Sequence, residues 1–100
     1  MNLQKKINLK NMANDRPVTE RLVEENLNWK LDNYLQKFKS EEIEWKLSLT
    51  LEKNKKDLFN GSLQLIIDGK RFRYKREDYK KLDDLINHLF DHFKEELANK

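Results

Sequence analysis

The ten residues from 67 to 76, IDGKRFRYKR, hold five cations and two aromatic rings directly after an Asp-Gly pair. Cations interleaved with aromatics are typical of strands that bind nucleic acid, where rings stack on bases and cations meet phosphates. Phe72 and Tyr74 have the parity expected of an apolar face, so we expect them to pack in a core. The opposite parity then presents a row of cations on an open face: Arg71, Arg73 and Lys75.

The sequence leaves two interpretations of this basic row open. A row of cations attracts phosphates by releasing counterions and carries no sequence information, which suits binding to folded RNA by shape. Charged side chains on an edge strand also discourage aggregation without binding anything. Further cations stand at the ends of the stretch or just beyond it: Lys70, Arg76, Lys80 and Lys81.

No group of residues in the sequence predicts a catalytic or metal site. His88 and His92 stand four residues apart on a helix, a spacing that can hold a metal, but no HExxH pattern or third ligand accompanies them, and a solvated helix face is favoured. The chain has no cysteine, nucleophile motif or Gly-rich phosphate loop. We therefore predict no catalytic residue, metal, cofactor or small-molecule substrate.

The composition indicates one small domain. The 100 residues include one Pro and two Gly, so residues 1–100 are expected to form a single unit. No signal-peptide core and no run near the ~20 apolar residues of a membrane span is present, which predicts a cytoplasmic protein. The net charge of +3 is uneven: residues 1–17 carry +3 and 61–81 carry +4, whereas 82–100 carry −3.

Apolar periodicity predicts the elements that position these residues. Alternation predicts strands over residues 4–11, 41–53, 62–68 and 70–76, with Asp68 and Gly69 forming a hairpin turn between the last two. In the strand 41–53, Ile43, Trp45, Leu47, Leu49 and Leu51 share one face.

Two helices are predicted from spacing near 3.6 residues. The first covers residues 18–38, with Thr19 as its N-cap and Val18 and Val23 as a hydrophobic staple. Its apolar stripe is Val23, Leu27, Leu31, Tyr34, Leu35 and Phe38. The second follows the segment REDY, with a stripe made of Tyr79, Leu82, Leu85, Ile86, Leu89, Phe90, Phe93 and Leu97.

The resulting order is β-α-β-β-β-α. Strands two to four form an antiparallel meander with one polar face, so both helices are expected on the other face. This predicts an α+β, two-layer sandwich with a mostly antiparallel four-stranded sheet. Trp45 is expected to be a packing residue, and so is Trp29, although Trp29 lies off the main stripe and exposure is its alternative.

Four segments of the sequence stand in the order known from one protein family. They are VTERL and KLDNYLQKF of the first helix, FNG before the third strand and DYKKLDDLINHL before the last helix. In this order the chain resembles the ribosome hibernation promoting factor family, also called ribosome-associated inhibitor or factor Y. The resemblance implies a fold similar to double-stranded RNA-binding domains. It also implies binding to the small ribosomal subunit and its rRNA, in the channel for mRNA and tRNA, which stops translation and preserves idle ribosomes.

The resemblance implies a short form, without the dimerisation domain of long forms and monomeric off the ribosome. The family's last helix usually carries Lys or Arg where this chain has His88, Asp91, Glu95 and Glu96. RNA binding is therefore expected from the fourth strand, the start of the last helix and the first helix: Arg71, Arg73, Lys75, Arg76, Lys80, Lys81 and Lys30. The alternatives are a protein-interaction or oligomerisation module using the edge of the fourth strand, and a general binder of double-stranded RNA.

Overall fold

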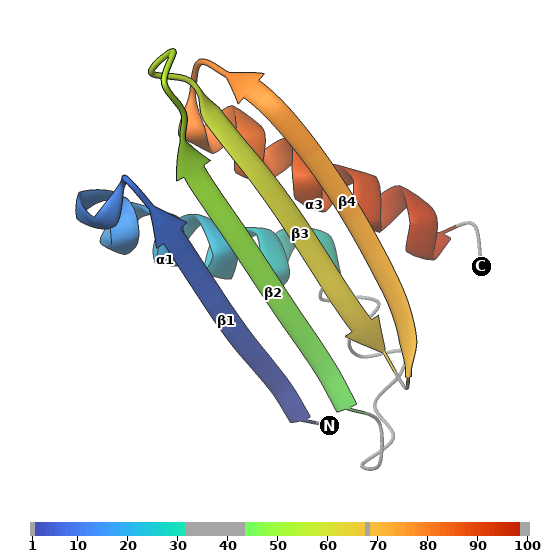
Figure 1. Ribbon diagram of the computed structural model, residues 1–100. Coiled ribbons are helices and arrows are strands. Elements are labelled where there is room, and N and C mark those ends of the chain that lie inside the picture. The colour runs from blue at the N-terminus through green and yellow to red at the C-terminus, as the bar shows by residue number, and fades with distance from the viewer. Residues whose placement is uncertain (1, 32–43, 68, 99–100) are drawn as a thin grey trace.

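The computed structural model describes residues 2–31, 44–67 and 69–98 (Figure 1). The predicted element order and the α+β class are confirmed. The elements are β1 (Asn2–Lys10), a 3-10 turn η1 (Ala13–Asp15), α1 (Arg16–Asn26), a π-helical turn η2 (Leu27–Leu31), β2 (Glu44–Lys53), β3 (Phe59–Ile67), β4 (Lys70–Tyr79) and α3 (Leu82–Ala98).

The four strands form one sheet in the order β1-β2-β3-β4. The β1 and β2 strands run parallel, because the chain crosses over through α1 between them, and the later pairs are antiparallel. Gly69 has a φ of 82°, which only glycine adopts without strain and which fits the predicted hairpin turn. Its partner in that prediction, Asp68, lies outside the described residues.

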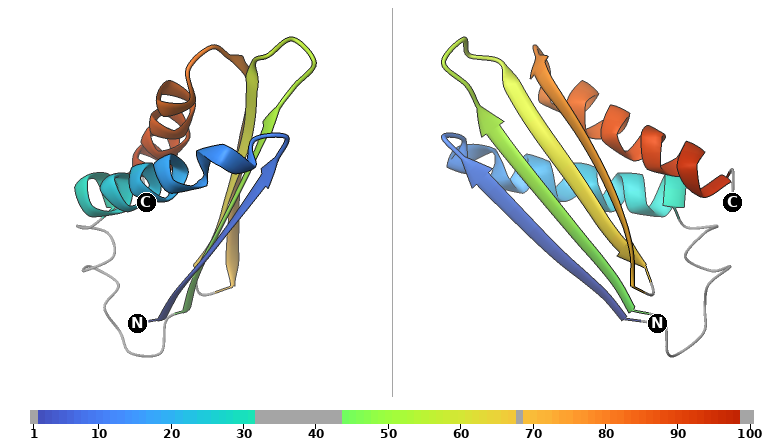
Figure 2. Two further views of the ribbon diagram at one scale, coloured as in Figure 1. Left: turned by 90° about the vertical axis from the view of Figure 1, so that its left-hand side faces the viewer. Right: turned by 45° about the vertical axis from the view of Figure 1, so that its right-hand side comes forward.

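Both helices lie on the same side of the sheet, as predicted (Figure 2). Alternate residues of β2 and β3 are buried beneath them, and α3 contributes an apolar stripe at helical spacing. The fully buried side chains include Trp45, Leu47, Leu49, Leu51, Leu63, Leu65, Leu85, Ile86, Leu89, Phe90 and Phe93. No helix in the described ranges is long and apolar enough to cross a membrane.

The start of α1 differs from the prediction. Asp15 occupies the N-cap position and Pro17 lies in the first turn, where its missing N–H costs nothing. Thr19 is therefore not the cap but a fully buried residue inside the helix, and Val18 is 43% exposed, so no hydrophobic staple forms. The helix begins at Arg16 because proline starts a helix as well as a capping side chain does.

The third and fourth strands, β3 and β4, are longer than predicted. β3 begins at Phe59, and β4 continues to Tyr79, so the prediction that Tyr79 belongs to the stripe of the last helix is wrong. The register shifts between Phe59 and Gly61, and Asp78 takes a φ of 61°. A β-bulge of this kind admits polar residues that an alternation rule does not recognise as strand.

The end of α1 contains a buried polar contact that the apolar stripe did not reveal. Asn26 donates a hydrogen bond to the Leu22 carbonyl at 2.8 Å and another to Asn87 of α3 at 2.9 Å. Beyond it the chain takes up the π-helical turn, in which Trp29 is 84% exposed. The predicted apolar residues Tyr34, Leu35, Phe38 and Ile43 lie outside the described residues.

Candidate nucleic-acid interface

The face of the sheet that no described helix covers is polar, and its side chains stand in rows across the strands. The register pairs Lys6 with Ser48, Ser48 with Gln64, and Gln64 with Arg73. Paired residues point to the same side, so these four side chains form one row across about 14 Å of sheet, given a strand spacing of about 4.8 Å. We call this surface the open face.

The open face has a positive excess. Its cations are Lys6, Lys10, Lys46, Arg71, Arg73 and Lys75, and its anions are Glu44, Glu52 and Glu77. Two of the cations have a partner, because Lys10 lies 3.3 Å from Glu52 and Lys75 lies 3.3 Å from Glu77. Arg71 and Arg73 are exposed and make no ion pair with another described residue. Their guanidinium groups are available to an anion.

Small neutral side chains occupy the middle of the open face. Thr50, Asn60 and Ser62 line a shallow hollow together with Glu52 and Glu77, and two of the β4 cations form one of its walls, Arg73 and Lys75. Cations, hydroxyl groups and amide groups are the side-chain types that bond phosphate and sugar oxygens of a nucleic-acid backbone.

Arg76, predicted to contact RNA together with this row, lies on the opposite side of β4. It pairs with Gly61, whose position faces the helices, and its guanidinium carbon is 4.9 Å from the centre of the Tyr74 ring. The same ring stacks on His92 of α3, with centres 3.5 Å apart and planes 11° apart. Phe72 and Tyr74 pack against the core, as predicted, so neither ring is presented on the open face.

Lys80 and Lys81 occupy a third location, at the end of the sheet where β4 leads into α3. Both are exposed. The loop between β2 and β3 reaches the same end, because Asn54 donates a hydrogen bond to Asp78 at 2.8 Å. The side chain of Lys30, the remaining predicted residue, lies outside the described residues. The predicted set is thus divided among separate surfaces.

The helix layer is acidic over α3. This helix carries one lysine, Lys94, and five carboxylates: Asp83, Asp84, Asp91, Glu95 and Glu96. The prediction of a solvated histidine face is wrong for His92, which stacks on Tyr74 and lies 2.9 Å from Glu96, and His88 meets the edge of Tyr79 at 5.7 Å. Within the described ranges no group of three or more side chains could hold a metal ion.

Sequence reasoning missed three cations of the open face, Lys6, Lys10 and Lys46. Their parity already set them opposite the apolar residues, but only the pairing of β1 with β2 brings them onto one surface with Arg71 and Arg73. The composition of residues 52–61 also predicts only a solvated connection, although this segment holds Lys53 at the end of β2 and Lys55 and Lys56 in the β2–β3 loop.

No family model matches the sequence, and no curated protein matches it. Among solved structures, the crystal structure of the Thermus thermophilus Protein Y N-terminal domain matches with a TM-score of 0.67. The chain has the fold of the Protein Y N-terminal domain. The match covers 99% of this chain and 98% of that one, at 18% sequence identity. The Protein Y fold is the one that the resemblance to the factor Y family predicted, so sequence pattern and structure agree on the architecture.

Proposed function

We propose that this protein is a ribosome-associated translation inhibitor that binds rRNA of the small subunit through the open face. The observation that carries the proposal is the row on β4, where Arg71 and Arg73 project from a polar sheet surface without an acidic partner among the described residues. The Protein Y fold and the sequence resemblance favour the ribosome as the source of the RNA.

The mechanism we propose is occlusion and requires no chemistry. A single rigid domain places cations on rRNA phosphates in the channel that mRNA and tRNA would use, so translation stops by competition. Because the contacts are to phosphates, recognition depends on the shape of folded RNA. The protein would act in the cytoplasm as a monomer formed by residues 1–100, preserve idle ribosomes under stress, and need no cofactor or small-molecule substrate.

The test is co-sedimentation with purified small subunits at several salt concentrations. Arg71→Ala together with Arg73→Ala should weaken binding about tenfold or more, because charge-assisted hydrogen bonds are lost, and should reduce the salt slope by roughly two. Arg21→Ala together with Lys94→Ala removes the same charge from the helix layer and should change neither. Circular dichroism should show that both variants remain folded.

Competition separates occlusion from other modes of binding. Added mRNA and tRNA should displace the wild-type protein from small subunits. Equal affinity for any duplex of about 16 base pairs would instead indicate a general binder of double-stranded RNA. A concentration-dependent dimer that ignores ribosomes would indicate an interaction module built on the β4 edge. Unchanged subunit affinity of the Arg71 and Arg73 variant across salt would overturn the proposal.

A further inference from the structure

The loop between β2 and β3 is held in one conformation by its own side chains. The Asn54 Oδ1 accepts hydrogen bonds from the backbone N–H groups of Lys56 at 2.9 Å and Leu58 at 3.1 Å. The backbone adds bonds from the Asn54 N–H to the Leu58 carbonyl at 2.8 Å and from the Asp57 N–H to the Asn54 carbonyl at 3.1 Å. An Asn that bonds the backbone two residues on defines an Asx-turn, which orders the loop.

The same loop is fastened to the neighbouring strands. Asn54 donates through Nδ2 to Asn60 at 3.1 Å and to Asp78 at 2.8 Å, and the Asp78 N–H donates to the Asn60 Oδ1 at 3.0 Å. These bonds join the end of β2, the start of β3 and the end of β4. A loop ordered in advance loses little conformational entropy when a ligand binds to it.

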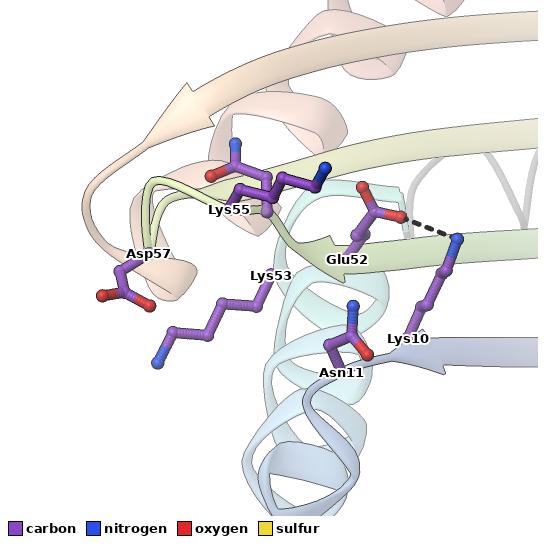
Figure 3. A pocket seen from close by; sticks show the side chains of 7 residues that line it. Lys10, Asn11, Glu52, Lys53, Lys55 and Asp57 are labelled. Atoms are coloured by element: carbon purple, nitrogen blue, oxygen red, sulfur yellow. Dashed lines mark ion pairs between the residues drawn. The ribbon is translucent and has the colours of Figure 1, made fainter.

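Lysines from the ends of β1 and β2 and from this loop surround a hollow at the end of the sheet (Figure 3). The hollow, of about 500 Å³, lies between the end of β1 and the loop and is lined by Lys10, Asn11, Glu52, Lys53, Asn54, Lys55 and Asp57. Figure 3 shows Lys10 directed at Glu52, to which it is paired at 3.3 Å. Lys53 and Lys55 make no ion pair with another described residue, so two ammonium groups remain for an incoming anion.

The hollow is continuous with the open face. Glu52 lines both this hollow and the one between Thr50 and Lys75. Glu52 lies two residues beyond Thr50, a step of about 6.7 Å along a strand. A polyanion that lies along the open face therefore reaches the loop without leaving the surface.

We propose that this end of the sheet is a second RNA-contact site, in which Lys53 and Lys55 bind phosphates of the strand held by Arg71 and Arg73. The inference rests on the proposed function and assigns a partner to a segment that the sequence presents as a solvated connection. The ligand is the backbone of RNA, because the site offers lysine ammonium groups and amides, which suit phosphate oxygens. Lys80 and Lys81 flank the same end of the sheet.

The first experiment repeats the small-subunit binding assay with Lys53→Ala together with Lys55→Ala. We expect about a tenfold loss of affinity and a salt slope lower by roughly two, against no change in the Arg21 and Lys94 control. Adding the Arg71 and Arg73 substitutions should sum the two effects on log affinity, as separate contact sites do.

A second variant tests the ordering of the loop. Asn54→Ala keeps every cation but removes the bonds that fix the loop, so affinity should fall several-fold while the salt slope stays at the wild-type value. A drop in the slope like that of the lysine variant would contradict a positioning role for Asn54.

The absence of cysteine from the chain allows a contact measurement that does not depend on affinity. Lys55→Cys, Arg73→Cys and Lys94→Cys each create one thiol for a tethered RNA-cleaving probe. Cleavage of rRNA is expected from positions 55 and 73 and not from 94. If the wild-type protein fails to bind subunits, the proposed function falls and this inference with it. If position 73 cleaves and the Lys53 and Lys55 variant behaves like the control, only this inference is overturned.

Discussion

The two faces of the sheet are made by alternate residues of the same strands, and they differ in burial and in polarity. In β2, Trp45, Leu47 and Leu49 are fully buried under the helices, whereas Lys46 and Thr50, which have the opposite parity, are exposed. The covered face gains free energy from removing apolar surface from water. The open face keeps its hydration and contributes little to folding, so its residues are available for binding.

Charge separates the same two sides of the molecule. The open face has three more cations than anions, and α3 has four more anions than cations. The net charge of +3 conceals this difference. A polyanion that approaches the protein is attracted to the sheet and repelled by the last helix, which orients it before contact.

The largest expected effect comes from truncating the covered face. Leu65 is fully buried, and Leu65→Ala should lower the free energy of unfolding by about 2 to 5 kcal/mol, because it removes buried methyl groups and leaves a cavity. Gln64→Ala, at the adjacent open-face position, should change it by less than about 0.5 kcal/mol. Urea unfolding followed by circular dichroism measures both. Similar losses in the two variants would mean that the faces do not divide stability from binding.

A smaller effect is expected at Gly61, where leucine side chains of β2 and α3 leave no room for a Cβ. A Cβ on Gly61 would lie 3.0 Å from side-chain atoms of Leu51 and Leu85 and 3.1 Å from Leu89. Gly61→Ala should therefore cost about 1 to 3 kcal/mol of unfolding free energy through overpacking. Ser62→Ala, on the open face, is the matched control and should be nearly neutral. A stabilised Gly61→Ala protein would show that the leucines move aside without cost.

The smallest effect should follow from recharging the helix layer. Asp84→Lys together with Glu95→Lys reverses two of the five negative charges on α3. The new charges on α3 are separated from RNA on the open face by the thickness of the sheet and helix layers, which is about the Debye length of 8 to 10 Å. Salt screens charges at this distance, so affinity for small subunits should rise less than about threefold. Tightening by more than about tenfold would assign the contact to the helix layer, against the proposal.

Much of this fold follows from local pattern. The alternation in β2 and β3 and the stripe from Leu85 to Phe93 in α3 predicted buried residues correctly, because a buried face demands apolar side chains at the period of its element. The boundaries were less accurate. Thr19 looked like a cap, and the fourth strand was expected to end at Arg76, because a proline start and a β-bulge obey no period. Positive φ at Asp78 and its bond to Asn60 depend on a residue eighteen positions away.

The candidate site, too, could be predicted from the sequence only in part. Parity along one strand was sufficient to place Arg71, Arg73 and Lys75 together and to direct Phe72 and Tyr74 inward, since successive side chains of a strand point to opposite faces. The same parity sets Arg76 on the inward face with Tyr74, where its guanidinium lies over that ring. Parity could not unite Lys6 and Lys46 with the arginines or Lys10 with the β2–β3 loop. Those neighbours meet through strand order and register, which arise from packing of the whole sheet against its helices and are encoded in no single segment.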